Sequence, residues 1–223
     1  MKVCAISDLH GKLPEKIESC DLLLIAGDIV PLNCQFDNEL SQWWFTVNFK
    51  NWIDSLPVSK ILFVGGNHDK YLCKNKQEVQ LKFPKENKCT YLCNELYEYN
   101  GLKIFASPYC HQFGNWYFMH SDEKLAKLYS EVPENVDILM VHDMPYNCSD
   151  QCLGFNSPSE RELHRGSKPL EQLLVEKHPI KFIGGHLHTC DHNWIKYYDT
   201  EVVCASLLNE SYQAVYDPIY FDV

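Results

Sequence analysis

Five apolar runs in this chain each end in a polar cluster, and this repeated pattern constrains the fold more than any other feature. The clusters read "SDLH", "AGD", "GGNHD", "VHDMP" and "GGHLH" in chain order. Short apolar runs that stop at glycine and polar residues are typical of buried strands. We therefore expect strands over 2–7 and 22–26, and at the start of each of the segments 60–70, 137–145 and 181–189.

Helices and hairpins fill the intervening segments. The apolar spacing over 36–55 predicts a helix, and 166–178 predicts another with Pro169 in its first turn. Asn100-Gly101 lies between two alternating runs, which is a strong hairpin signal. We expect further short strands within 193–206 and 212–223, and we expect these late elements to pair antiparallel. This order of elements predicts an α/β (α+β) fold with mixed sheets, as one domain over 1–223.

Composition limits the function. The chain has 223 residues, a formal net charge of -10 and only two arginines, Arg161 and Arg165. We expect no nucleic-acid polymer as partner, since a protein that grips a phosphate backbone normally presents a basic face. The N-terminus lacks the apolar length of a signal peptide and no run could span a membrane, so we expect a cytoplasmic protein without membrane association. The eleven cysteines contain no Cys-x-x-Cys pair, and we expect most to be reduced and buried.

The polar clusters share one type of chemistry. Taken singly, each has a simpler interpretation: a helix cap, a turn or a structural histidine. Taken together, they place carboxylate, imidazole and amide groups at the carboxyl ends of five strands, where α/β sheets bind ligands. Such groups bind manganese, iron, nickel or zinc. The candidate ligands exceed what one ion needs, and they are Asp8, His10, Asp28, Asn67, His142, His186 and His188.

In these five clusters and their order the sequence resembles the calcineurin-like metallophosphoesterases, two-metal enzymes that hydrolyse phosphate esters. The clusters span 7–188, and the segment "FASP" and the C-terminal "ASLLNESYQAVYDPIYFDV" look most like the small metallophosphoesterase-domain phosphodiesterases. The resemblance implies two mixed β-sheets packed together and flanked by helices. It also implies two divalent ions, with manganese expected first and iron, nickel or zinc as alternatives.

The resemblance assigns roles to the matching positions. Asp8, His10 and His188 would hold one ion, Asn67, His142 and His186 the other, and Asp28 would bridge the two. His68 would meet the substrate and the leaving group, and Asp69 would orient His68. The implied reaction is attack on phosphorus by a hydroxide that bridges the metals.

One cluster departs from the family pattern. Asp143 and Met144 follow His142, where the family commonly has glycine and proline. The carboxylate of Asp143 could alter metal preference, bind a proton or face water, and we expect it to face water.

The substrate is less constrained by the sequence. The resemblance favours a small phosphodiester, with a cyclic nucleotide as one candidate. A phosphomonoesterase acting on a metabolite or phosphoprotein, and a non-catalytic scaffold of the same fold, are the alternatives. His111, Asn115, Trp116 and Tyr117 could stack on or hydrogen-bond a base, although they could equally pack beneath a loop.

Overall fold

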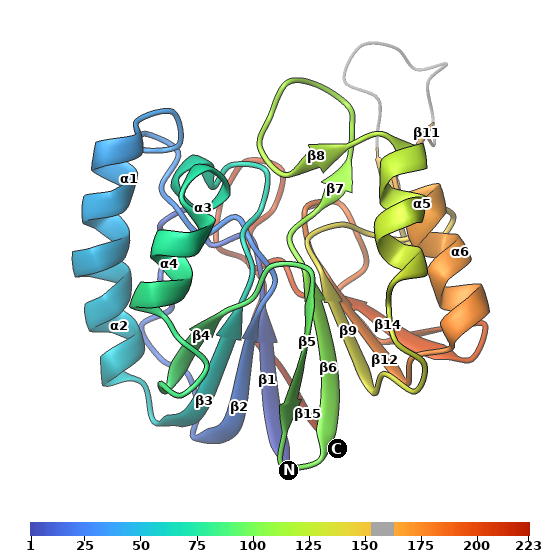
Figure 1. The fold of residues 1–223 in the computed structure, drawn as a ribbon, viewed down its shortest axis with the longest axis horizontal. Helices are drawn as coiled ribbons and strands as arrows, with labels where there is room; N and C mark the ends of the chain where they lie inside the picture. The colour runs from blue at the N-terminus through green and yellow to red at the C-terminus, as the bar shows by residue number, and fades with distance from the viewer. Residues whose placement is uncertain (153–162) are drawn as a thin grey trace.

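A computed structural model describes residues 1–152 and 163–223. Two large sheets pack face to face, and helices cover the outer face of each (Figure 1). This arrangement confirms the layered α/β fold expected from the sequence.

The first sheet has the strand order β15-β1-β2-β3-β4. Strands β1 to β4 are parallel, and β15 runs antiparallel along β1. The strands are β1 (Lys2–Ile6), β2 (Cys20–Ile25), β3 (Val58–Phe63), β4 (Cys89–Tyr91) and β15 (Ile219–Asp222).

The second sheet has the order β13-β14-β12-β9-β6-β5. Its strands are β13 (Ile195–Tyr197), β14 (Thr200–Cys204), β12 (Lys181–Gly184), β9 (Ile138–Val141), β6 (Leu102–Ser107) and β5 (Glu95–Tyr99). The predicted hairpin is present: Tyr99 pairs with Leu102, and Asn100 and Gly101 both have positive φ, as two-residue hairpin turns require. The expectation of antiparallel pairing was only partly right. The central strands β9 and β12 are parallel to each other. The β5–β6 hairpin joins them through β6, which is parallel to β9, and the β13–β14 hairpin joins them through β14, which is parallel to β12.

The helices divide between the two outer faces. The segment predicted as one helix contains α1 (Asn38–Trp44), a π-helical turn η1 (Phe45–Phe49) and α2 (Lys50–Ser55). With α3 (Lys70–Lys74) and α4 (Lys76–Lys82) they lie on the side of the first sheet, whereas α5 (Asp122–Ser130) and α6 (Lys168–Lys177) lie on the side of the second (Figure 1). The α6 helix begins where the sequence predicts, because the hydroxyl of Ser167 caps it by accepting from the N–H of Leu170 at 3.4 Å.

Strand alternation distributes the core among these layers. Val3 and Ala5 of β1 pack between the sheets, whereas Cys4 and Ile6 point to the layer beneath the helices. This is the period of two that places successive side chains on opposite faces. Buried layers on both faces explain why the parallel strands are almost continuously apolar.

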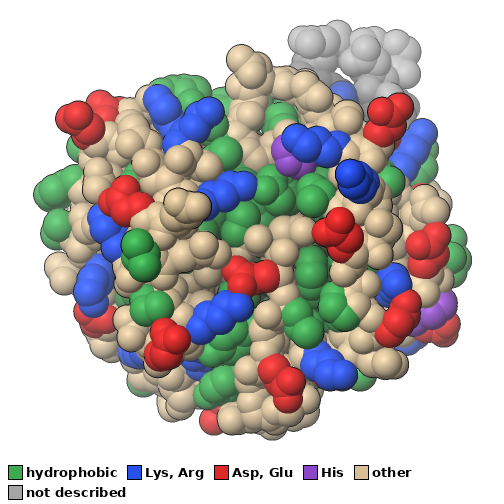
Figure 2. Space-filling model, in the orientation of Figure 1, with side chains coloured by type: hydrophobic (Ala, Val, Ile, Leu, Met, Phe, Trp, Pro, Cys, Tyr) green, Lys and Arg blue, Asp and Glu red, His purple; other side chains and the backbone are tan. Residues whose placement is uncertain are grey.

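Two short strand pairs lie at the ends of the long strands. They are β7 (Cys110–His111) with β8 (Met119–His120), and β10 (Gln151–Cys152) with β11 (Leu163–His164). In the part of the chain that the structure describes, no helix has both the length and the apolar character of a membrane span. On the face drawn in Figure 2, basic side chains are interspersed with acidic ones.

Candidate metal centre

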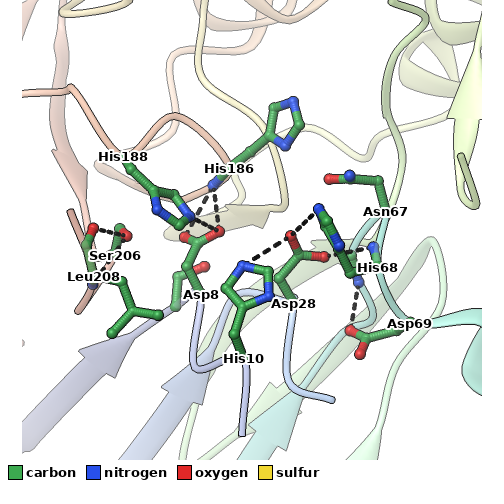
Figure 3. A network of polar contacts seen from close by, with 12 residues as sticks. Asp8, His10, Asp28, Asn67, His68, Asp69, His186, His188, Ser206 and Leu208 are labelled. Carbon is green, nitrogen blue, oxygen red and sulfur yellow. Dashed lines mark hydrogen bonds and ion pairs between the residues drawn. The ribbon is translucent and has the colours of Figure 1, made fainter. Parts of the chain in front are cut away.

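The five polar clusters meet at one edge of the two sheets. Nδ1 of His142, which follows β9 in the second sheet, donates to the carbonyl of Ala26 after β2 in the first, at 2.8 Å. The backbone N–H of His186 after β12 donates to the carboxylate of Asp8 after β1, at 3.0 Å. Both sheets therefore supply side chains to one site (Figure 3).

The backbone of this site is conformationally unusual. Asp8, His10, Asp28 and His186 have φ of 55°, 41°, 51° and 73°, in the left-handed region. Few residues other than glycine adopt this conformation, and it persists where the surrounding structure enforces it. Strained residues cluster at functional sites, so their coincidence with four predicted ligands favours a functional centre.

Two glycines permit the close approach of the loops. A Cβ on Gly66 would lie 2.2 Å from Oδ1 of Asp28, and one on Gly185 would lie 2.0 Å from Oγ of Ser7 and 2.7 Å from Oδ2 of Asp8. Any side chain at these positions would displace a carboxylate of the site. Steric crowding therefore explains why glycine occupies these positions in the third and fifth clusters.

One set of candidate ligands consists of Asp8, His10 and His188. Their ligand atoms lie within 4.8 Å of one another. Nδ1 of His188 lies 2.9 Å from the carbonyl oxygen of Asn209, which can only accept, so Nδ1 carries a proton and Nε2 faces Asp8 at 3.4 Å. Both ring nitrogens of His10 are buried without a hydrogen-bond partner among the residues described. A cation at this position would satisfy a buried imidazole that otherwise has no partner.

The second set consists of Asp28, His142 and His186, again with ligand atoms within 4.8 Å of one another. Because Nδ1 of His142 donates to a carbonyl, its Nε2 is the nitrogen available as a ligand. Oδ1 of Asn67 lies 3.1 Å from that Nε2. The structure thus brings all four residues predicted for this position together.

Asp28 lies between the two sets. Its Oδ2 is 3.5 Å from Nε2 of His10, and its Oδ1 is 3.3 Å from Nε2 of His142. The two oxygens of one carboxylate therefore face different ligand sets, an arrangement in which a carboxylate can bridge two ions.

The electrostatics of the site suit cation binding. Burial would raise the pKa of Asp28, but the charges of His142 and His68 lower it well below its usual value. Burial alone would lower the pKa of His142, but the charge of Asp28 outweighs burial and raises this pKa to about 10. Protons on the imidazole thus balance the buried carboxylate, and a bound cation would displace them.

The imidazoles of His10 and His186 differ from that of His142, because their pKa values are lowered. Burial lowers the pKa of His10 to about 4. Burial and the charge of His142 lower that of His186 to about 4 as well. Both rings are therefore neutral near pH 7, which is the form that ligates a metal. A donor set of carboxylate, amide and neutral imidazole fits divalent transition metals.

Comparisons with known proteins agree with this geometry. Residues 1–190 match the family model for calcineurin-like phosphoesterases. The chain belongs to the calcineurin-like phosphoesterase family. The UPF0046 protein C25E10.12 of Caenorhabditis elegans is 29% identical over 99% of this chain and 80% of its own length. The metallophosphoesterase domain-containing protein 1 of Homo sapiens is 26% identical over 99% of this chain and 70% of its own length.

A solved structure shows the same fold. The phosphopantetheinyl hydrolase from Mycobacterium tuberculosis aligns with a TM-score of 0.55 over 94% of this chain and 90% of its own, at 14% identity. The solved structure confirms the fold. The family match confirms the family that the sequence resembles, a family of metal-dependent phosphoester hydrolases.

His68 lies next to Asp28, between the two sets of candidate ligands and the cavity. Its Nε2 lies 3.8 Å from Oδ2 of Asp28, and its backbone N–H donates to Oδ1 of Asp28 at 2.8 Å. Nδ1 of the ring contacts the side-chain oxygen of Gln35, and the ring of Trp116 lies against it with centroids 4.5 Å apart. Gln35 has no motif around it that sequence analysis could have used.

The role expected for Asp69 needs correction. Its buried carboxylate does not orient His68 but accepts hydrogen bonds from backbone N–H groups of Ile29, Val30 and Gly66, at 3.1, 2.9 and 2.9 Å. These donors lie in the loops that carry Asp28 and Asn67, and without Asp69 they would be buried and unpaired. Asp69 therefore positions two loops of the site.

A cavity of about 870 Å³ opens beside the metal ligands. His111 and Trp116, two of the predicted substrate residues, line it. Asn115 is exposed and lies outside the lining, and Tyr117 instead donates its backbone N–H to the carbonyl of Asn67 at 3.2 Å. Sequence analysis missed other lining residues, among them Gln35, Tyr146, Arg165, Lys168 and Tyr212.

Asp143 does not face water as expected, because it is fully buried. Its carboxylate accepts from the backbone N–H of His111 at 2.8 Å and from Nδ1 of the same residue at 3.1 Å. Burial raises the pKa of Asp143, but contact with His111 lowers it below its usual value overall. The departure from the family pattern thus anchors one wall of the cavity.

Proposed function

We propose that this protein is a dinuclear-metal-dependent phosphodiesterase that hydrolyses a small phosphodiester, with a cyclic nucleotide as the first candidate. The observation that carries the proposal is the position of Asp28, whose two oxygens face two separate sets of ligands. Family membership supports phosphoester hydrolysis. The preference for a diester is supported by the likeness to the small phosphodiesterases of this family, and it awaits the test below.

The residues would divide the work as follows. Asp8, His10 and His188 would hold one divalent ion, Asn67, His142 and His186 the other, and Asp28 both. Manganese is the proposed metal, with iron, nickel or zinc as alternatives for the same ligands. When bound, such ions act as Lewis acids on phosphoryl oxygens and lower the pKa of water.

His68 would handle the leaving group. Its Nδ1 donates to the oxygen of Gln35, which leaves Nε2 on the side of Asp28 and of the cavity. A proton on Nε2 is placed to pass to the departing oxygen, as a general acid requires. Trp116 lies against the ring and excludes water from that side.

The cavity supports a small organic substrate. Its volume of about 870 Å³ is in the range of pockets that enclose small molecules. Aromatic side chains line it, including Phe113, Trp116 and Tyr212. The net charge of -10 does not favour a nucleic-acid polymer, so we propose a small phosphate ester as the partner.

The test is turnover of two chromogenic esters by the protein loaded in turn with Mn, Fe, Ni, Zn and Mg. Bis(p-nitrophenyl) phosphate should be hydrolysed faster than p-nitrophenyl phosphate, and His68→Ala should lose about 100-fold or more in kcat while still binding metal. Faster hydrolysis of the monoester would instead indicate a phosphomonoesterase. No turnover with any metal would reject catalysis and favour a scaffold.

A further inference from the structure

One wall of the cavity carries cations that no described carboxylate neutralises. Arg165 and Lys168 line the cavity together with His164. Neither Arg165 nor Lys168 forms an ion pair within the described residues, unlike six other lysines. Nζ of Lys168 lies 5.2 Å from the centre of the Tyr146 ring, which also lines the cavity. The second arginine of the chain, Arg161, lies outside the described residues.

Hydrogen bonds to a buried aspartate and to a neighbouring loop hold this wall in place. The buried carboxylate of Asp150 accepts from Nδ1 of His164 at 2.6 Å and from the backbone N–H of Gly166 at 2.8 Å. The backbone N–H of Ser167 donates to the carbonyl of Met144 at 2.8 Å. The segment 164–168 is thus fixed to the loop that follows β9 and begins with His142. The backbone that carries Arg165 and Lys168 is therefore held in a fixed position relative to His142.

His111 faces the same space. Because Asp143 accepts from its Nδ1 and its backbone N–H, the ring is fixed and Nε2 is the nitrogen left for the cavity. Burial and the charge of Arg165 lower the pKa of His111, whereas Asp143 and Asp122 raise it above its usual value overall. Arg165 and His111 therefore line the same part of the cavity.

We propose that Arg165 and Lys168, with His111 beside them, form a second anion-binding site that accepts a phosphate group of the substrate other than the one hydrolysed. Guanidinium groups bind phosphate with two parallel hydrogen bonds. The cavity of about 870 Å³ has room for an organic group with two phosphates. The inference rests on the proposed function of the metal centre. It narrows the substrate from simple cyclic nucleotides, which carry one phosphate, to phosphodiesters that carry a second phosphate group.

Besides Asp28, two carboxylates line the cavity, and they provide a control. They are Asp122 and Glu210, and among the described residues neither forms an ion pair with Arg165 or Lys168. Asp122 acts on His111 with the sign opposite to that of Arg165. Removing the charge of Asp122 should therefore strengthen the binding of a second phosphate, and removing that of Arg165 should weaken it.

The experiment compares adenosine 3′,5′-bisphosphate with adenosine 5′-monophosphate as inhibitors of bis(p-nitrophenyl) phosphate hydrolysis by the metal-loaded protein. Both carry the same base, so the ratio of their inhibition constants reports the second phosphate. We expect the bisphosphate to bind about 10-fold more tightly, or about 1.4 kcal/mol. Arg165→Ala should bring the ratio close to one, Arg165→Lys should give an intermediate value, and Asp122→Asn should raise it.

A surface lysine supplies the matched control. Lys50 is paired with Asp54 on α2 and does not line the cavity, so Lys50→Ala removes one positive charge and should leave the ratio unchanged. A ratio that is the same in Arg165→Ala as in the unaltered protein, or near one in both, overturns the proposal. If no ester is hydrolysed, the proposed function fails, and calorimetric titration of the two nucleotides into the same variants still decides whether the second site exists.

Discussion

Oδ1 of Asp28 lies 3.3 Å from Nε2 of His142, and the other oxygen of the same carboxylate faces His10. The carboxylate of Asp28 therefore faces both ligand sets, whereas His186 and His188 each belong to one set. We expect Asp28→Asn to abolish tight binding at both positions. His186→Ala and His188→Ala should each lose one ion and retain the other in part. Metal content measured by mass spectrometry of the equilibrated protein checks this, and equal losses in all three variants would contradict it.

Gly66 gives a steric prediction. A Cβ there would lie 2.2 Å from Oδ1 of Asp28, so Gly66→Ala should displace that carboxylate and weaken metal binding by about 10- to 100-fold, as for other changes that shift a ligand. Gly101→Ala is the control, because its Cβ would meet nothing within 4 Å although its φ of 83° makes the substitution unfavourable. It should lower the melting temperature with no change in metal affinity. Calorimetric metal titration of both variants separates the two effects.

Gln35 should matter for turnover and not for metal binding. Its side-chain oxygen holds Nδ1 of His68, and it belongs to neither ligand set. We expect Gln35→Leu to lower kcat roughly 10- to 100-fold, because misplaced catalytic groups cost that much. Gln35→Glu keeps an accepting oxygen and should lose less. Unchanged kcat in Gln35→Leu would show that the ring of His68 is oriented by something else.

Asp69 should matter first for stability. Its carboxylate accepts from three backbone N–H groups at Ile29, Val30 and Gly66, all in loops of the site. Asp69→Ala would leave these buried donors unpaired, and we expect a loss of roughly 1–3 kcal/mol in the free energy of unfolding for the first unsatisfied group alone. Urea denaturation of the metal-free protein measures the loss. A stability equal to that of the unaltered protein would contradict the role of Asp69 in holding the two loops.

The cysteines give a prediction on pH. The ten cysteines whose side chains the structure describes form no disulfide, and burial raises the pKa of Cys4 and of Cys148 to about 12. At pH 8 only about one in 10⁴ of such thiols is ionised, against roughly a quarter of a thiol with a pKa of 8.5. Cys73 is only half-buried, whereas Cys4 is fully buried, so iodoacetamide should alkylate Cys73 well before Cys4. Peptide mapping over time checks the order, and the rate at Cys4 should rise about 100-fold between pH 8 and pH 10.

The strands and the ligand clusters could be predicted because both depend on local pattern. The apolar run before Asp28 has the length and the ending of a buried strand, and the hairpin at Asn100-Gly101 follows from the φ values that only such residues adopt readily. The joining of β6 and β14 in parallel could not be predicted in this way, because it depends on which strand of each hairpin meets the central pair.

The missed features of the site depend on contacts between distant segments. Asp143 was expected to face water, yet its carboxylate pairs with His111, which lies 32 positions earlier in the chain. Gln35 and Arg165 reach the cavity from loops without a motif. The short helices α3 and α4 were also missed, since five and seven residues show too little periodicity.

Each ion would join the two halves of the chain. One ligand set takes Asp8 and His10 from the loop after β1 and His188 from the loop after β12, so its members come from different sheets and lie 178 or more positions apart. Occupancy would then act as a reversible cross-link at one end of the sandwich, resembling a disulfide in how it closes a long loop. Hydrogen exchange in β1 and β12 should slow together as metal is added, because the metal centre would also stabilise the contact between the two sheets.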